Sequence, residues 1–354
     1  MEKIIDPVYK ELLIKELTPD KKLRDTNKGG NEIYSVTWQN APNVVREVGR
    51  LREISFREAG GSSGLALDLD EFDTMENPYR QLIVWDPEAQ AILGGYRYIM
   101  GTDVKINEDG QPHLATSHMF HFSERFIKDY LPHVIELGRS FVTPEYQSSR
   151  AGAKGLFALD NLWDGLASLM IMRPKNIYFF GKMTMYPDYD SVGHDLILRY
   201  LWKHFGDSEE LVRPIKPVMP HNEGRLLDLI LNEDDPKKDY RNLKDAIRSL
   251  GTNIPPLINT YINTSHSTKM FGTAVNEEFS NVEETGILVC FDEIYDDKRA
   301  RHVESFLQQT ISKLKERFPR LQESKGLEEK LSRRWSERRA VIRRKFDRKL
   351  NKKD

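Results

Sequence analysis

Cysteine is almost absent from this sequence, since Cys290 is the single one among 354 residues. One cysteine excludes an intramolecular disulfide and a metal site of the CxxC type, and it is typical of the reducing cytoplasm. Long apolar runs are also missing, because no stretch approaches the roughly 18 apolar residues that span a bilayer. The first residues, MEKIIDPVYKELLIKEL, are charged and lack the apolar core of a signal peptide. We therefore expect a cytoplasmic protein without membrane-spanning helices.

Charge is unevenly distributed along the chain. The net charge is −2, yet residues 326–354 contain 12 Lys and Arg against 5 Asp and Glu. Apolar residues of this tail recur at spacings of four or seven, which predicts a helix with one apolar stripe among arginines. The stripe residues are Leu327, Leu331, Trp335, Ile342, Phe346 and Leu350. Such a helix could bind an anionic membrane surface at the inner face of the membrane, bind an acidic carrier protein, or remain a solvated extension. Nucleic acid is not expected as a partner, because nothing else in the chain supports it.

The chain alternates between strand-like and helix-like segments. Residues 80–86, 91–100 and 133–142 are short runs rich in β-branched and aromatic residues, and they predict three strands of one sheet. Further strands are predicted at 175–185 and 285–291, helices at 41–61, 154–172 and 194–206, and a mainly helical region at 1–60. We expect an α/β (α+β) fold with a core at 1–205, a C-terminal half at 206–296 that completes the sheet and pocket, and a basic helical tail at 297–354.

One of the predicted strands contains two opposite charges. Glu136 and Arg139 interrupt the apolar run VIELGRSFV around Gly138. Burying an unpaired ion costs several kcal/mol, so these residues indicate either a structural salt bridge or a reaction centre. Residues three apart face opposite sides of a regular strand, but a β-bulge at Gly138 would bring them toward one side.

Other charged residues lie at the edges of the predicted elements. Arg52 precedes the end of the first clear helix, DLDEFD at 68–73 contains Asp70 and Asp73, and Arg97 lies within the second strand. Each of these residues alone is typical of an exposed surface. Their order along the chain is more informative than any one of them.

That order resembles a known family. The segments that carry the resemblance are DLDEFD (68–73), GGYRY (94–98), IELGRSFVTPEYQ (135–147), LFALDNLWDGLA (156–167) and YFFGKMTM (178–185). They resemble the ornithine-lipid and glycine-lipid N-acyltransferases, a GNAT-superfamily branch often labelled hemolysin-like and related to the acyl-homoserine-lactone synthases. The resemblance covers roughly residues 45–205, and ELGRS followed by VxPxY is its most specific part. It implies a GNAT-like fold with a twisted mixed central sheet flanked by helices.

The resemblance also implies a reaction. We expect transfer of a long acyl chain, with or without a 3-hydroxyl group, to an amino acid such as glycine or ornithine, giving a lyso-aminolipid. The stretch QSSRAGAKG, residues 147–155, lacks the glycine spacing of the CoA-binding loop in acetyl-CoA users of this superfamily. The expected donor is therefore an acyl carrier protein with its phosphopantetheine thioester, acyl-CoA is less favoured, and no bound cofactor or metal is expected. Arg150 and Lys154 are the candidate ligands for the donor phosphate.

Each motif residue can be given a role in amide formation. Glu136 would take a proton from the acceptor ammonium, and a backbone N–H near Phe141 or Val142 would bind the oxyanion. Arg139 would hold Glu136 or the acceptor carboxylate. Arg52, Asp70, Asp73 and Arg97 would bind the substrate or fix one another. The alternative is a purely structural network of Glu136, Arg139, Arg97 and Asp73.

Two other functions fit parts of the sequence. An acyl-homoserine-lactone-type synthase would use S-adenosylmethionine as the acceptor. A non-catalytic, membrane-associated protein derived from the GNAT fold would agree with the hemolysin-like label. The product formed with a panel of acceptors distinguishes the three.

Overall fold

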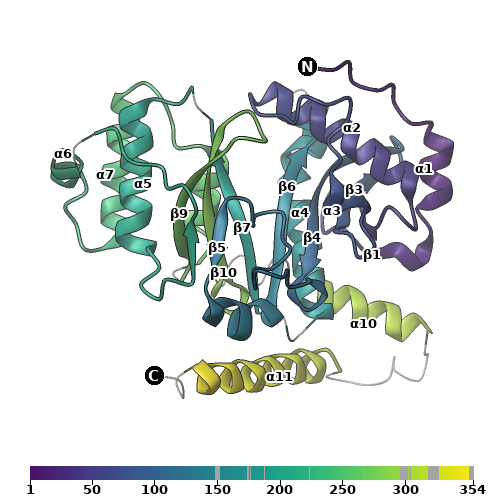
Figure 1. Cartoon of the computed structure of the whole chain (residues 1–354). Helices are drawn as coiled ribbons and strands as arrows, with labels where there is room; N and C mark the ends of the chain where they lie inside the picture. Colours follow the sequence, from purple (N-terminus) through teal and green to yellow (C-terminus); the bar gives the residue numbers. More distant parts are fainter. Residues whose placement is uncertain are drawn as a thin grey trace.

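A large mixed sheet runs through the molecule (Figure 1). The computed structural model describes residues 1–147, 152–173, 175, 177–186, 188–222, 224–265, 267–295, 302, 304–317 and 327–350. Eight strands form the sheet in the order β1-β2-β3-β4-β6-β7-β10-β9. They span Lys22–Asp25 (β1), Glu32–Val36 (β2), Arg80–Asp86 (β3), Ala91–Met100 (β4), Val134–Val142 (β6), Tyr178–Met185 (β7), Lys269–Asn276 (β9) and Val282–Cys290 (β10). A two-stranded sheet pairs β5 (Phe120–Phe122) with β8 (Val212–Pro214).

Helices cover both faces of the sheet. They span Lys10–Glu16 (α1), Pro42–Glu58 (α2), Glu71–Thr74 (α3), Gly152–Met172 (α4), Ser191–Phe205 (α5), Gly224–Ile230 (α6), Pro236–Ser249 (α7), Pro256–Ile262 (α8), Ser305–Arg317 (α10) and Leu327–Leu350 (α11). The apolar side of α2 packs with Ile83, Trp85 and Phe141, whereas α4 packs on the opposite face with Leu82 and Val84. Alternate residues of β3 are therefore buried on opposite faces of the sheet, each under a different helix, as the two-residue period of a strand requires.

The ends of the long elements follow from local sequence. Pro42 begins α2, where its fixed φ suits the first helical turn and its missing N–H leaves nothing unpaired. Gly60 follows the helix with a φ of 91°, a left-handed conformation that glycine adopts without steric cost. Arg52 and Ser55 of α2 therefore lie on the sheet face on which the charged residues of β6 are located.

The mixed α/β fold and several elements are confirmed. β3 and β4 coincide with the strands predicted at 80–86 and 91–100, and β3, β4 and β6 are neighbours in one sheet. The prediction that residues 1–60 are mainly helical is wrong where β1 and β2 pair as an edge hairpin. Both strands are short and contain polar as well as apolar residues, and only one residue of β1 is buried. Their sequences therefore carry little signal for a strand. β9 was not predicted either, although most of its residues are buried, because Gly272 and Thr273 interrupt the apolar pattern of KMFGTAVN.

The basic tail forms a helix, as its periodicity predicts. Residues 327–350 are α11, which lies along one end of the sheet (Figure 1). Trp335 and Ile342 of the predicted stripe are half-buried against the body. The side chains of Leu327, Leu331, Phe346 and Leu350 lie outside the described residues. Of the helices that the structure describes, none combines the length and the apolar character needed to cross a membrane.

Candidate active site

The site lies where two neighbouring strands of the sheet separate. β6 and β7 are parallel, and their pairing covers only Val134–Glu136 against Tyr178–Phe180. Beyond this point β6 continues along β4, and β7 continues along β10 as far as Met185. The two halves of the sheet thus diverge, and a pocket opens between β6 and β7.

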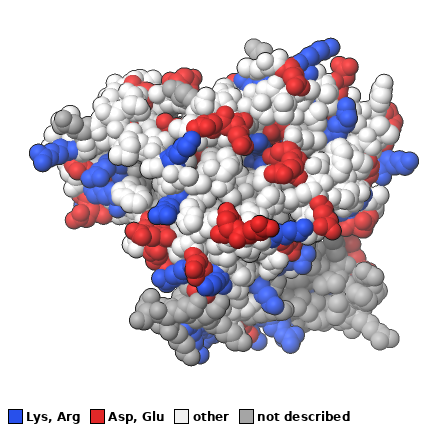
Figure 2. All heavy atoms as spheres, in the orientation of Figure 1, with Lys and Arg blue, Asp and Glu red and all other residues white. Residues whose placement is uncertain are grey.

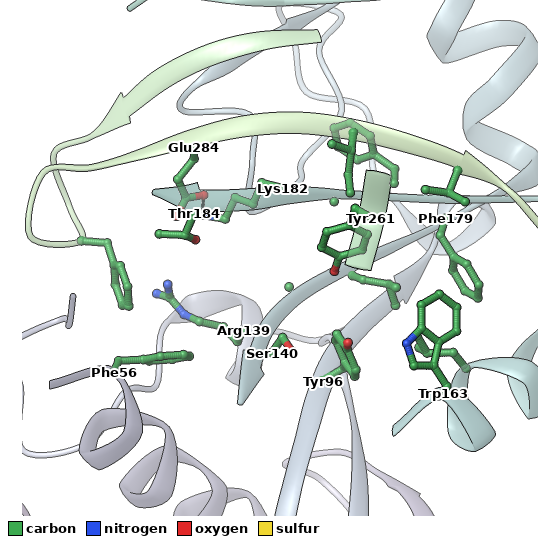
Figure 3. A pocket seen from close by; sticks show the side chains of 18 of the residues that line it. Phe56, Tyr96, Arg139, Ser140, Trp163, Phe179, Lys182, Thr184, Tyr261 and Glu284 are labelled. Carbon is green, nitrogen blue, oxygen red and sulfur yellow. Dashed lines mark ion pairs between the residues drawn. The ribbon is translucent and has the colours of Figure 1, made fainter. Parts of the chain in front are cut away.

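The pocket has an apolar half and an ionic half. Its apolar lining comes from α4, β7, α8 and β10 and includes Trp163, Leu166, Phe179, Tyr261, Ile287 and Val289. Its ionic lining contains Arg139, Lys182 and Glu284 (Figure 3). Figure 3 shows Tyr96, Ser140 and Tyr261 between these two halves. An amphipathic ligand can therefore lie with its chain beneath α4 and its polar head beside β7.

A β-bulge in β6 turns Arg139 toward the other charged residues. Gly95 pairs with Phe141 and Arg97 pairs with Gly138, so β6 contains one more residue than β4 across this interval. Arg139 adopts a φ of 49°, which is uncommon for a residue with a side chain. The bulge was expected at Gly138, and the left-handed residue is the next one along. As a result the guanidinium groups of Arg97 and Arg139 both contact Asp70.

Glu136 is buried on this same face and is held by two hydroxyl groups. Thr116 donates a hydrogen bond of 2.7 Å to Oε1, and Tyr79 donates a very short one to Oε2. Glu136 also lines a small cavity together with Arg97 and Lys182. This cavity shares residues 137–139 and Lys182 with the large pocket, so the carboxylate lies directly beside the place where a ligand would bind.

The environment of Glu136 suits a proton acceptor. Burial raises the pKa of its carboxyl group, although the hydrogen bonds from Tyr79 and Thr116 and the cations of Arg97 and Lys182 oppose the rise. A raised pKa makes a carboxylate a stronger base at neutral pH, provided that it remains ionised. The two hydroxyl donors keep the ionised form accessible, because they bond to the carboxylate oxygens.

The remaining predicted residues form an ion-pair network beside Glu136. Arg52 contacts Asp73 at 2.8 Å, and Arg97 contacts Asp70 at 2.6 Å and Asp73 at 3.3 Å. Burial would raise the pKa of Asp73, but Arg52 and Arg97 outweigh it and the pKa lies below its usual range. Asp73 also caps α3 with Asp70, so the acidic loop has a fixed conformation.

Arg139 belongs to this network rather than to Glu136. Its Nε atom lies 3.1 Å from Asp68 and its guanidinium group lies over the ring of Phe279, 4.6 Å from the centroid. The proposed salt-bridge alternative joined Glu136 and Arg139, but the contacts that the structure gives Glu136 are those from Tyr79 and Thr116. Arg139 is partly exposed to the pocket, where it can meet a ligand.

Phe141 and Val142, the two residues expected near the oxyanion, have different surroundings. Phe141 is buried in the core below α2. The carbonyl of Val142 accepts hydrogen bonds from Ser55 at 3.3 Å and from Gln147 at 2.6 Å. Because Thr143 donates to Leu93 across the ladder, alternation directs the N–H of Val142 away from β4. Arg150 lies outside the described residues, as does the side chain of Lys154.

Sequence reasoning missed the ion pair between Lys182 and Glu284. The pair is buried at the ionic end of the pocket, and burial lowers the pKa of Lys182, with Arg139 and Arg97 adding to the fall and Glu284 opposing it. Lys182 and Glu284 each place a charge within an apolar strand, as Glu136 does. The sequence pattern that singled out Glu136 would therefore have identified both. Tyr79 and Thr116 gave no signal, because a lone hydroxyl residue near a strand is common.

Comparisons with known proteins agree with this architecture. Residues 51–155 match the family described as acetyltransferase (GNAT) domain, and the chain is an acyltransferase. It is 61% identical over 315 residues to glycine N(alpha)-acyltransferase of Bacteroides thetaiotaomicron, covering 89% of this chain and 94% of that protein. A protein of the same name from Phocaeicola vulgatus is 58% identical over 309 residues, or 87% of this chain and 95% of that protein. The chain therefore belongs to the glycine N(alpha)-acyltransferase family, and the predicted kinship with GNAT N-acyltransferases is confirmed.

One solved structure is also similar to this chain. It is a CoA-dependent acyl-homoserine lactone synthase with SAM and isopentyl-CoA, at a TM-score of 0.34 and 12% identity, covering 79% of this chain and 89% of that chain.

Proposed function

We propose that this acyltransferase moves a long acyl chain from the thioester of an acyl carrier protein to the amino group of glycine. The observation that carries the proposal is the pocket between β6 and β7, which is apolar beneath α4 and ionic beside Glu136. The apolar half supports an acyl chain, with or without a 3-hydroxyl group, as the transferred group. The names of the two relatives support glycine as the acceptor. The product would be an N-acyl glycine, a lyso-aminolipid.

The reaction needs a neutral amine beside the thioester carbonyl. The nitrogen attacks the carbonyl carbon, the C–S bond breaks, and the thiol leaves with a proton. In this proposal Glu136 removes the proton from the glycine ammonium group, directly or through one water molecule. An N–H of β6 near Phe141 or Val142 would stabilise the oxyanion, because N–H groups aimed at developing charge lower the barrier to acyl transfer.

The cations of the pocket fit the acceptor carboxylate. Arg139 and Lys182 both face the ionic half, and each can pair with a carboxylate while the amino group points toward Glu136. The guanidinium group of Arg139 is held by Asp68 and Asp70, so it is oriented before the ligand binds. The ion pairs of Asp73 with Arg52 and Arg97 then hold the acidic loop at 68–73, which contains Asp68 and Asp70, in position.

The surface of α11 supports an acidic donor protein. Arg339 and Arg343 pair with Asp292 and Glu293, which fixes the helix to the body. Lys330, Arg333, Arg334, Arg344 and Arg348 are exposed on it. Figure 2 shows Lys and Arg side chains at this end of the molecule. We propose that this surface binds the carrier protein or an anionic membrane at the inner face, where the amphiphilic product would be released.

The test uses purified protein with one acyl chain presented on acyl carrier protein and on CoA. Glycine, ornithine, serine and S-adenosylmethionine serve as acceptors, and mass spectrometry identifies the product. The proposal expects N-acyl glycine, formed faster from the carrier-protein thioester. A lactone from S-adenosylmethionine would establish the synthase activity instead, and no product from any pair would refute catalysis of this transfer.

A further inference from the structure

A second cluster of ionisable side chains lies apart from the pocket, around the first turn of α5. His194 and Asp195 are both buried residues of this helix. His221, in the segment between β8 and α6, approaches them from the surface, with its side chain 66% exposed. One nitrogen of each histidine and one oxygen of Asp195 lie within 4.8 Å of one another. Three potential ligand atoms thus converge from two segments of the chain.

The distances within the cluster suit a single ion. Nδ1 of His194 lies 2.8 Å from Oδ1 of Asp195, and Nδ1 of His221 lies 3.7 Å from the same oxygen. Ligand atoms about 2.0–2.2 Å from a tetrahedral Zn²⁺ lie about 3.3–3.6 Å apart. The His221 distance is therefore close to this value, and the His194–Asp195 contact would lengthen by about half an ångström when the ion binds. His221 is exposed, so an ion and its water ligands can reach the cluster from solvent.

The outer contacts of these residues match those of metal ligands. Nε2 of His194 lies 2.5 Å from a carboxylate oxygen of Glu283, the residue before Glu284 on β10. Oδ2 of Asp195 accepts hydrogen bonds of 2.7 and 2.8 Å from the N–H and the side-chain amide of Asn222. A histidine that binds a metal through one nitrogen usually donates its other N–H to a carboxylate, which fixes the ring and its tautomer.

The charge balance also favours a cation here. Both nitrogens of His194 face carboxylates, Nδ1 that of Asp195 and Nε2 that of Glu283. Two carboxylates that converge on one imidazole ring attract a cation to its vicinity.

We propose that His194, Asp195 and His221 bind a divalent transition-metal ion, with Zn²⁺ as the best match. The two imidazole nitrogens suit Zn²⁺ far better than Mg²⁺ or Ca²⁺, which select oxygen, and Zn²⁺ also accepts a carboxylate oxygen. Water would complete the coordination. The ion would join the segment before α6 to α5. Through its contact with His194, Glu283 would also connect the site to β10, the strand that contains Glu284 of the pocket.

Metal binding by the intact protein tests the proposal directly. After treatment with EDTA and desalting, the protein is titrated with ZnCl₂ by calorimetry, and bound zinc is measured by elemental analysis. We expect one Zn²⁺ per chain, affinity at least tenfold lower in His221→Ala, and a 10–100-fold loss in Glu283→Gln, which keeps every ligand but weakens the support of His194. His118→Ala removes another exposed histidine and should bind as the unaltered protein does.

Thermal unfolding gives a second readout that is independent of acyl transfer. Saturating Zn²⁺ should raise the unfolding temperature of the unaltered protein and of His118→Ala, because an ion that binds only the folded state stabilises it. His221→Ala should fold, since this side chain is largely exposed, but should show no rise. Absence of saturable binding, or equal binding and equal stabilisation in His221→Ala, would overturn the proposal.

Discussion

The hydroxyl group of Tyr79 joins Glu136 to the backbone of a separate loop. It donates to Oε2 of Glu136 and accepts a hydrogen bond of 2.9 Å from the N–H of Ala115. Thr116, the next residue of that loop, donates to the other carboxylate oxygen. The loop before β5 and the strand β6 are therefore coupled through one carboxylate. A carboxylate held at both oxygens has a fixed direction, which is what a general base needs.

Glu136→Gln should abolish most of the acyl transfer. The amide fits the same space and can accept the hydrogen bond from Tyr79, but it cannot take a proton from the acceptor. We expect turnover to fall roughly 100-fold or more, the range that general-base catalysis contributes. Initial rates of amide formation measure this. Glu124→Gln, an exposed glutamate, is the matched control, and turnover near the original level in Glu136→Gln would assign Glu136 a structural role.

Tyr79→Phe should shift the pH dependence of the reaction. The Tyr79 hydrogen bond lowers the pKa of Glu136 against the larger effect of burial, so its loss should raise that pKa further. Because the base must be ionised, the acidic limb of the kcat/KM profile should move to higher pH. Tyr98→Phe, which removes a buried hydroxyl bonded to Ser35, controls for general effects of losing a phenol. An unmoved acidic limb in Tyr79→Phe would show that this limb does not report Glu136.

The sequence predicted the strand that carries the site better than the site itself. An apolar run interrupted by Glu136 and Arg139 was enough to locate β6 and its bulge, because both depend on local pattern. The partners of Glu136 could not be found in this way, since Tyr79 and Thr116 meet it only after 57 and 20 residues of chain are folded back. The same holds for Lys182 and Glu284, which pair across two strands far apart in sequence.

The edge hairpin of β1 and β2 shows that local sequence can also fail to predict a strand. β1 and β2 are short, and their alternation of polar and apolar residues also fits a helix over so few positions. Their pairing with β3 decides the conformation, because β2 lies between β1 and β3 in the sheet. Tertiary packing thus overrides a weak local preference.

Lys182→Met should destabilise the protein through the glutamate that it leaves behind. Glu284 is buried, and without Lys182 its charge would have no close cation among the contacts that the structure gives it. Breaking a buried ion pair on one side costs about 3–5 kcal/mol of unfolding free energy, whereas replacing both partners often costs little. We expect Lys182→Met to show a loss of this order in urea unfolding, and the double variant with Glu284→Gln to recover most of it. Additive losses in the double variant would show that the two residues do not stabilise each other.

Reversing two exposed charges of α11 should weaken the use of the carrier-protein donor. Arg344→Glu and Arg348→Glu change exposed residues, whereas Arg339 is buried against Asp292 and deletion of the whole helix would remove that contact too. If α11 binds the acidic carrier, the double variant should raise KM for the carrier-protein thioester several-fold and leave KM for the same acyl chain on CoA unchanged. High salt should have the same effect on the unaltered protein, because exposed charges are screened over about 8–10 Å. The matched control, Arg241→Glu with Lys244→Glu on α7, makes the same charge change on a separate helix at the flank of the molecule (Figure 1). Equal KM values in the two double variants would remove α11 as the carrier-protein surface, and weaker sedimentation of the α11 variant with anionic vesicles would then assign the helix to the membrane.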